Sequence, residues 1–221
     1  MPSISRAKIF LISTLLGISC VNAGQCGDNG GVELGWGTMA AADANGENVN
    51  TALGFKSTGP FDAEGNPILT VIATNAGFDS SFYLFNAWIC GQDTVGFQQT
   101  NYGAMLGEAG AETSLCLTAS AIETSNITLS MQPCVNDIST PPVPTQMFEW
   151  NENGDFITYY LVFLGNTTGL PLKETANTDY TPSLVPATNT TGAYIRLDYT
   201  PGANAPLTGD VNGIVLELSD D

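Results

Sequence analysis

Histidine is absent from this chain of 221 residues, and only five residues are lysine or arginine. Without histidine, the chain cannot form a Ser-His-Asp or Cys-His catalytic arrangement or an imidazole-ligated metal site. The 22 acidic residues give a net charge of −17, which excludes nucleic-acid binding through phosphate neutralisation and docking on anionic lipid. Phosphate-cradling and dinucleotide-binding motifs are absent too, so the sequence predicts no cofactor.

Long apolar runs are also missing. The first run, Ile9–Ile18, is too short to span a membrane, which takes about 20 apolar residues. Arg6 and Lys8 precede this run and the small-residue site Val21-Asn22-Ala23 follows it. This order is typical of a secretory signal, which we place at Met1–Ala23.

Cleavage before Gly24 leaves 198 residues (221 minus 23) and moves the net charge from −17 to −19, because two basic residues leave with the signal. That length suits a single domain over residues 24–221. Three N-glycosylation sequons begin at Asn126, Asn166 and Asn189. We therefore expect an extracellular glycoprotein, without membrane insertion and monomeric.

Cysteine is scarce but even in number after cleavage, since Cys20 leaves with the signal. The four that remain are Cys26, Cys90, Cys116 and Cys134. In an oxidising compartment they predict two disulfides, for which three pairings are possible. A zinc site is the alternative, but the chain has no Cys-x-x-Cys pair and no histidine.

Short segments rich in β-branched and aromatic residues recur between Gly, Pro and Asn clusters. They lie at 68–74, 82–89, 115–120, 127–132, 156–164, 194–199 and 213–218. Several alternate, so that Tyr83, Phe85 and Ala87 share one face. Ile127, Leu129 and Met131 form a second such set, and Ile195, Leu197 and Tyr199 form a third. The pattern predicts an all-β domain, a sandwich or a barrel, and Gly24–Asn50 is expected to be an irregular lead-in.

Internal repetition favours the barrel. Three times, a short strand and a polar turn precede an alternating strand: 68–90, 115–134 and 184–199. Similar links, 97–103 and 148–154, follow the first two units. Three imperfect copies predict a closed, pseudo-threefold barrel.

The middle copy resembles one repeat of the ricin B-type lectins. It runs from Cys116-Leu117 through Gln132-Pro133-Cys134 to Gln146-Met147-Phe148, and it is similar to repeats of small secreted fungal proteins of that family. The resemblance implies a β-trefoil that binds glycans or glycoproteins and is not an enzyme. It also implies a Cys116–Cys134 disulfide within the unit, which leaves Cys26 for Cys90.

The resemblance implies different roles for different positions of this unit. Gln146 and Phe148 would hold the unit together. Other residue types replace the sugar-binding residues of the family at four positions: Thr118, Ser130, Gln132 and Thr145. We therefore expect the middle unit not to bind sugar in the way of that family.

The first unit keeps an aromatic two residues before its cysteine, Trp88, and Asn86 four residues before it. These two are the candidate carbohydrate-binding residues, although ordinary packing is the alternative for Trp88. The strand that would carry the carboxylate of the family, Leu69–Ala73, offers none, so a neutral sugar would bind weakly.

Two other functions stay open. A structural or effector scaffold could bind a protein partner instead of a glycan. A hydrolase would need a pair of carboxylates, and the acidic residues mostly occupy turn-like segments. The oxygen-rich segment Asp43–Asn48 is reminiscent of a calcium loop, but its glycine comes too early for the EF-hand register. We predict no metal site.

Overall fold

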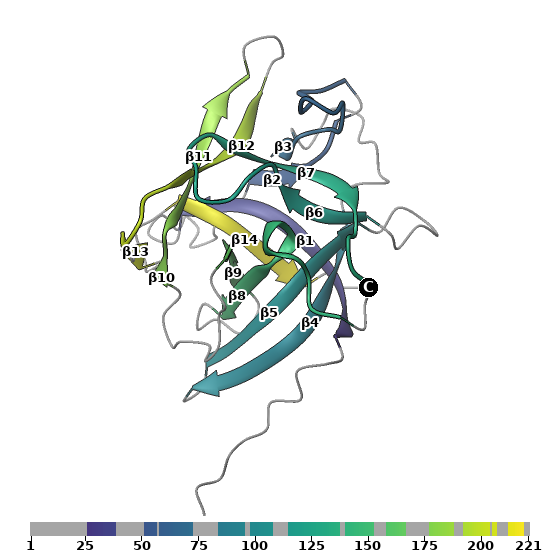
Figure 1. Ribbon diagram of the computed structural model, residues 1–221, viewed down its shortest axis with the longest axis vertical. Coiled ribbons are helices and arrows are strands. Elements are labelled where there is room, and N and C mark those ends of the chain that lie inside the picture. The colour runs from purple at the N-terminus through teal and green to yellow at the C-terminus, as the bar shows by residue number, and fades with distance from the viewer. Residues whose placement is uncertain are drawn as a thin grey trace, which may run out of the picture.

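The computed structural model describes residues 26–38, 51–56, 58–72, 84–95, 98–107, 115–137, 140–152, 158–166, 177–187, 192–203, 205–206 and 212–218 (Figure 1). Within these ranges the chain is all β, with no α-helix. The elements are β1 (Gly27–Thr38), β2 (Thr51–Gly54), β3 (Thr70–Val71), β4 (Leu84–Val95), β5 (Gln98–Gly107), β6 (Leu115–Ala119), β7 (Ile127–Pro133), the 3-10 helix η2 (Pro144–Gln146), β8 (Phe148–Glu152), β9 (Thr158–Phe163), β10 (Asn177–Thr178), β11 (Tyr180–Pro186), β12 (Ala193–Tyr199), β13 (Ala205–Pro206) and β14 (Asn212–Leu218). The predicted signal, Met1–Ala23, lies outside the described residues.

Six strands pair in a closed circuit. Strand β1 pairs with β4, β4 with β5, β5 with β8, β8 with β9, β9 with β14, and β14 returns to β1. Every one of these pairs is antiparallel, and Figure 1 shows β4 and β5 as the two long neighbouring strands at the lower end of the view. Because the circuit has no free edge, the backbone groups of all six strands have a partner strand on both sides.

Three further antiparallel pairs, β2–β3, β6–β7 and β11–β12, adjoin this circuit and meet one another. At the meeting point, the Leu69 amide donates to the Leu129 carbonyl oxygen at 2.7 Å, and the Ile195 amide donates to the Leu69 carbonyl oxygen at 3.0 Å. All three side chains are fully buried. Strands β7 and β12 and the residue directly before β3 thus each supply one apolar side chain to a common centre. Pairing of β7 with β12 closes a wider ring of ten strands.

The main core takes side chains from strands along the whole described chain, from Val32 on β1 to Leu216 on β14. The alternation predicted from the sequence is confirmed. Phe85 and Ala87 are fully buried, as are the alternating residues of β7 and β12: Ile127, Leu129, Met131, Ile195 and Leu197. Tyr199 packs against this core while partly exposed, and Tyr83 lies outside the described residues.

Two sequence expectations were wrong. The expected irregular lead-in contains a strand of 12 residues, β1, in which Val32 and Leu34 are buried. Its glycines lower strand propensity, but pairing with both β4 and β14 uses backbone groups that every residue carries, so tertiary pairing outweighs propensity. The expected links 97–103 and 148–154 overlap strands β5 and β8, because these two segments pair with each other and with β4 and β9 in the circuit.

The predicted strand at 68–74 is shorter than expected, because only Thr70 and Val71 form β3. Ile68 makes an isolated bridge to Ser130, and the backbone of Leu69 bonds to two different strands. No helix in the described part of the chain has the length and apolar character to cross a membrane.

Candidate functional site

A cavity of about 350 Å³ lies on the outward face of β4, β5 and β6. Its floor consists of Trp88, Ala104, Leu106 and the Cys116–Cys134 disulfide. Strand register explains this grouping, since Trp88 stands opposite Ala104, and Leu106 opposite Cys116. Residues directly opposite in an antiparallel pair point to the same face, so the pairing assembles one apolar surface outside the main core.

Both disulfides border this cavity. Cys26 bonds to Cys90 and Cys116 to Cys134, which confirms the predicted pairing. The first bond joins residues 64 apart in sequence and the second joins residues 18 apart. Disulfides of this kind are compatible with an extracellular protein.

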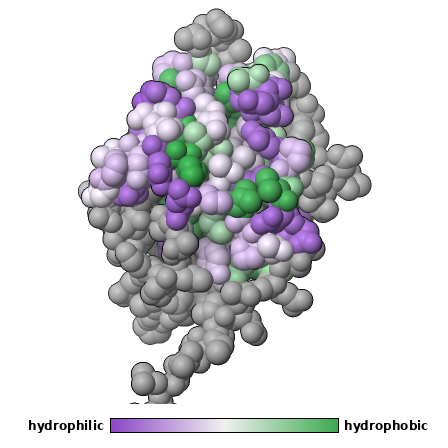
Figure 2. Space-filling model, viewed as in Figure 1, coloured by the Kyte–Doolittle hydropathy of each residue, from purple (hydrophilic) through white to green (hydrophobic). Residues whose placement is uncertain are grey.

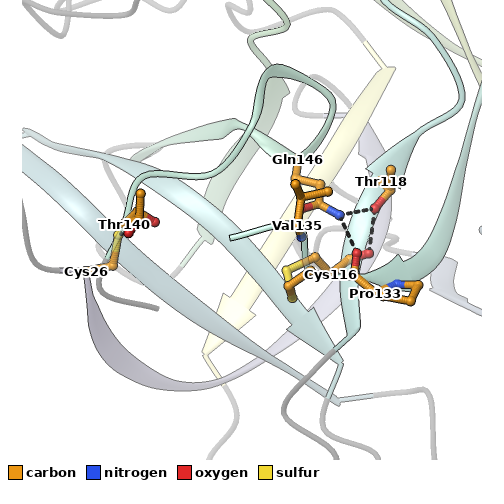
Figure 3. The surroundings of a disulfide bond; sticks show 8 residues. Cys26, Cys116, Thr118, Pro133, Val135, Thr140 and Gln146 are labelled. Carbon is orange, nitrogen blue, oxygen red and sulfur yellow. Dashed lines mark hydrogen bonds between the residues drawn. A yellow bond between two sulfur atoms is a disulfide. The ribbon is translucent and has the colours of Figure 1, made fainter. Parts of the chain in front are cut away.

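The segment that follows β7 forms the other wall. Cys134, Val135, Asn136 and Asp137 line the cavity, as do Thr140 and Pro142. Figure 3 shows Thr140 beside Cys26, where its carbonyl oxygen lies 3.8 Å from the Cys26 sulfur. Since that sulfur is in a disulfide and carries no proton, this is a packing contact.

Gln146 anchors this wall to the strands. Its Oε1 accepts a hydrogen bond from the Val135 amide at 3.0 Å, and its Nε2 donates to Thr118 Oγ1 at 2.9 Å and to the Pro133 carbonyl oxygen at 3.0 Å (Figure 3). The side chain is 1% exposed, and that of Phe148 is fully buried in the main core. Both residues hold the unit together, as the sequence predicts.

Trp88 is partly buried, and its packing partners belong to the outer cluster of Ala104, Leu106 and Cys116, not to the main core. Its position depends on Gly103, since a Cβ there would collide with the Trp88 carbonyl oxygen. Strand β4 bulges between Ile89 and Gly91, directly after Trp88. The bulge and the close approach of the two backbones fix the tryptophan at the cavity.

Besides Gln146, three polar residues line the cavity in the described structure: Asn136, Asp137 and Thr140. Thr140 Oγ1 donates to Asp137 Oδ1 at 3.1 Å, and Asn136 Nδ2 donates to the Pro141 carbonyl oxygen at 2.7 Å. Asn136 Oδ1 and the carboxylate of Asp137, which already accepts from Thr140, are hydrogen-bond acceptors at the cavity. Asp137 is the one charged residue among those that line the cavity in the described structure.

The other sequence-predicted sugar residue, Asn86, is partly buried and does not line the cavity. In the middle unit, Thr118 and Ser130 are buried, and Thr118 is bound to Gln146. Gln132 Nε2 donates to Ser130 Oγ at 3.0 Å and to Asp62 Oδ2 at 3.4 Å. These contacts give the middle-unit positions structural roles.

Asp62 also organises the turn that precedes β3. Its Oδ1 accepts from the Asn66 amide at 2.7 Å and from the Glu64 amide at 3.1 Å. Burial acts to raise the pKa of this carboxyl, but the hydrogen bonds from Asn66, Ser130 and Glu64 together outweigh it, so the pKa lies below its ordinary value. The carboxylate therefore stabilises the turn in its charged form.

The asparagines of two of the three sequons lie in the described structure. Asn126 is exposed at the end of the β6–β7 turn, in the left-handed backbone region with φ 62°. Asn166 is exposed and its Nδ2 donates to Glu123 Oε1 at 2.9 Å. Asn189 lies outside the described residues.

Few acidic or metal-ligating side chains gather among the described residues of this site. No group of three or more His, Cys, Asp or Glu side chains gathers for a metal within the described ranges. The segment Asp43–Asn48 lies outside them. The cavity lining holds a single carboxylate, whereas glycoside hydrolysis uses two.

Hydrophobic residues on the face shown in Figure 2 form small separate patches among hydrophilic ones. Among the described residues, the large hydrophobic side chains with the greatest exposure are Val135 at 66%, Phe61 at 48% and Leu184 at 38%. Of these, only Val135 belongs to the cavity.

Comparison with protein-family models, with curated proteins and with solved structures finds no match to this chain. The site therefore rests on its own geometry. Sequence reasoning identified Trp88 but missed Asn136, Asp137 and Thr140. No local signal marks these three, because they follow the second cysteine of a different unit and reach Trp88 only through the fold.

Proposed function

We propose that this chain is a secreted glycan-binding protein with a ricin B-like β-trefoil fold, and that it binds sugar in the cavity beside Trp88. The observation that carries the proposal is the position of Trp88. The residue that the family resemblance implies as a stacking platform lines a cavity of about 350 Å³ together with Asn136, Asp137 and Thr140.

The order of strand pairing supports the trefoil. A β-trefoil has three four-stranded units, and in each unit the outer two strands join a six-stranded circuit while the inner two form a pair beside it. The order around the circuit is β1, β4, β5, β8, β9 and β14. The two outer strands of each unit are therefore neighbours: β1 with β4, β5 with β8, and β9 with β14. The pairs β2–β3, β6–β7 and β11–β12 stand between them in the chain. The short strands β10 and β13 are an addition to the third unit.

The chemistry of the cavity suits a pyranose. One face of a pyranose ring is apolar and packs on an indole, while its hydroxyls donate hydrogen bonds outward. Asp137 and Asn136 Oδ1 supply acceptors at the rim, so the carboxylate that the first unit lacks comes from the middle unit. The volume is at the small end for ligand sites, which are about 300–1,000 Å³, and therefore fits a short glycan end.

Affinity is expected to be low for a single site. Asp137 is exposed, so water competes for its hydrogen bonds. A dissociation constant on the order of millimolar corresponds to about −4 kcal/mol.

The test is a glycan array with secreted protein, followed by titration of Trp88→Ala and Phe61→Ala with the sugar that binds. Phe61 is the matched control, because it is an exposed aromatic residue that does not line the cavity. We expect Trp88→Ala to abolish binding and Phe61→Ala to leave it within about twofold. Unchanged binding by a folded Trp88→Ala variant would place the sugar elsewhere, and no binding by the parent would refute the proposal.

A protein partner is the second candidate, and the exposure of Val135 favours it. This side chain is 66% exposed at the rim of the cavity, where an apolar group contributes more to a protein contact than to a sugar contact. Val135→Ser tests this candidate, since loss of the exposed methyl groups would weaken a protein contact more than the binding of a free sugar.

A further inference from the structure

The charge of the cavity indicates a narrower class of ligand. This inference rests on the proposed glycan binding and concerns which sugars the same cavity selects. Asp137 carries the one formal charge among the described residues that line it, and that charge is negative. A ligand that brings a positive charge to Asp137 would therefore meet no positive charge among the described lining residues that could repel it.

The neutral polar groups of the lining offer few donors. Gln146 uses both hydrogens of Nε2 and its Oε1 in bonds within the protein. The Thr140 hydroxyl donates to Asp137, and one hydrogen of Asn136 Nδ2 is used by Pro141. What remains toward a ligand is mainly acceptors, which match a ligand rich in N–H and O–H groups and disfavour a carboxylate or sulfate.

Trp88 adds to this preference. The face of an indole attracts a cation within about 6 Å of the ring, and tryptophan is the strongest of the aromatic side chains in this respect. Trp88 and Asp137 line the same cavity, so one positive group can lie near both.

The net negative charge of the whole chain also favours a cationic ligand. The chain has 22 acidic and five basic residues, so its field attracts cations and repels anions. Of the two basic residues in the described part, Arg196 is paired with Asp198 at 2.8 Å, and Lys56 does not line the cavity.

From these observations we infer that the cavity selects amino sugars with a protonated amine, such as glucosamine residues that carry no acetyl group. The apolar face of the ring packs on Trp88, and the ammonium group lies at the Asp137 carboxylate. Acetylation of the amine removes the charge and the preference.

The experiment compares trisaccharides of glucosamine, N-acetylglucosamine and glucose, with glucuronic acid as the anionic probe. Titrations are made at about pH 6, where an amine with an ordinary pKa is protonated. Affinities are measured by ligand-observed NMR titration, which also applies to Trp88→Ala. In proteins that keep Trp88, its indole N–H signal locates the binding, and the indole of Trp150, which is 2% exposed in the core, serves as internal reference.

We expect the glucosamine trisaccharide to bind about two- to fivefold more tightly than the two neutral ones, the range of an exposed ion pair. The advantage should disappear in Asp137→Asn and shrink at about 1 M salt, where charges are screened over about 3 Å. The control is Glu64→Gln, which removes the same charge at an exposed residue outside the cavity. The Glu64→Gln variant should keep at least half of the affinity advantage of the glucosamine trisaccharide.

Other outcomes separate this inference from the proposed function. Equal affinity for charged and neutral sugars, all lost in Trp88→Ala, would refute the selectivity and leave glycan binding intact. Glucosamine binding that survives Trp88→Ala would show attraction to the general negative surface, which also refutes the inference. If no sugar shifts the Trp88 signal, both proposals fail.

Discussion

Gln146 Nε2 lies 2.9 Å from Thr118 Oγ1, and both side chains are buried. Thr118 stands at a position where the resembling family has a sugar-binding aspartate. In this chain that position faces a buried glutamine, and it stabilises the fold. In the proposed trefoil, the middle unit therefore has structural residues at the positions that bind sugar in the family, and the candidate site consists of Trp88 and the segment after β7.

Gln146→Ala should lower the free energy of unfolding by about 2–4 kcal/mol, because it leaves the Val135 amide, Thr118 and the Pro133 carbonyl without their partner. Urea denaturation under oxidising conditions measures this. Gln132→Ala is the control. Its side chain is only partly buried, and the expected loss is about 1 kcal/mol or less. Equal losses would contradict the anchoring role of Gln146.

Trp88 and Trp150 should differ in their effect on stability. Trp150 is 2% exposed in the main core, so Trp150→Ala should cost about 3–5 kcal/mol. Trp88 is partly exposed on the outer cluster, and Trp88→Ala should cost about 1–2 kcal/mol. Chemical denaturation of both variants checks this, and a larger loss for Trp88 would make it a core residue.

Removal of either disulfide should destabilise the protein, and the longer loop should matter more. The chain-entropy model gives about 4 kcal/mol for Cys26–Cys90, whose partners are 64 positions apart, and about 3 kcal/mol for Cys116–Cys134, whose partners are 18 positions apart. Paired Cys→Ala variants compared by urea denaturation measure the difference. Peptide mapping without reduction checks the pairing itself, and a Cys90–Cys116 peptide would disprove it.

Asp62→Asn should lower stability at neutral pH and have less effect in acid. The pKa of Asp62 is lowered in the folded state, so the carboxylate contributes stability above its unfolded pKa. That contribution is lost as the pH falls through the folded pKa, below about pH 4. Because the carboxylate lies near solvent, we expect about 1 kcal/mol at most. Melting temperatures at several pH values test this, with Glu64→Gln as control. A difference in melting temperature between Asp62→Asn and the parent protein that stays constant with pH would contradict it.

Asn126 and Asn166 should carry N-linked glycans in material secreted from eukaryotic cells, since both side chains are exposed. Mass analysis of the secreted protein measures the added mass and also shows whether the chain begins at Gly24. Thr128→Ala should remove the Asn126 glycan and Thr128→Ser should keep it. Occupancy of Asn126 in the Thr128→Ala variant would contradict the assignment.

The alternating residues show what the sequence determines locally. Phe85 and Ala87, and Ile127 with Leu129, recur at every second position, and each pair lies buried in the core. The prediction of these buried residues succeeds because the side chains of a strand alternate between its two faces, whichever strand it pairs with. The length and charge of the chain, its four remaining cysteines and the positions of Gln146 and Phe148 could likewise be interpreted before the fold was known.

Tertiary structure decided the rest, because the deciding contacts join residues far apart in the chain. Strand β1 could not be predicted, since its glycines disfavour a strand and only pairing with β4 and β14 provides it. The cavity could not be predicted either. Trp88 and Asp137 are 49 positions apart in the numbering, and they line one cavity because strand register and the Gln146 anchor bring them to it.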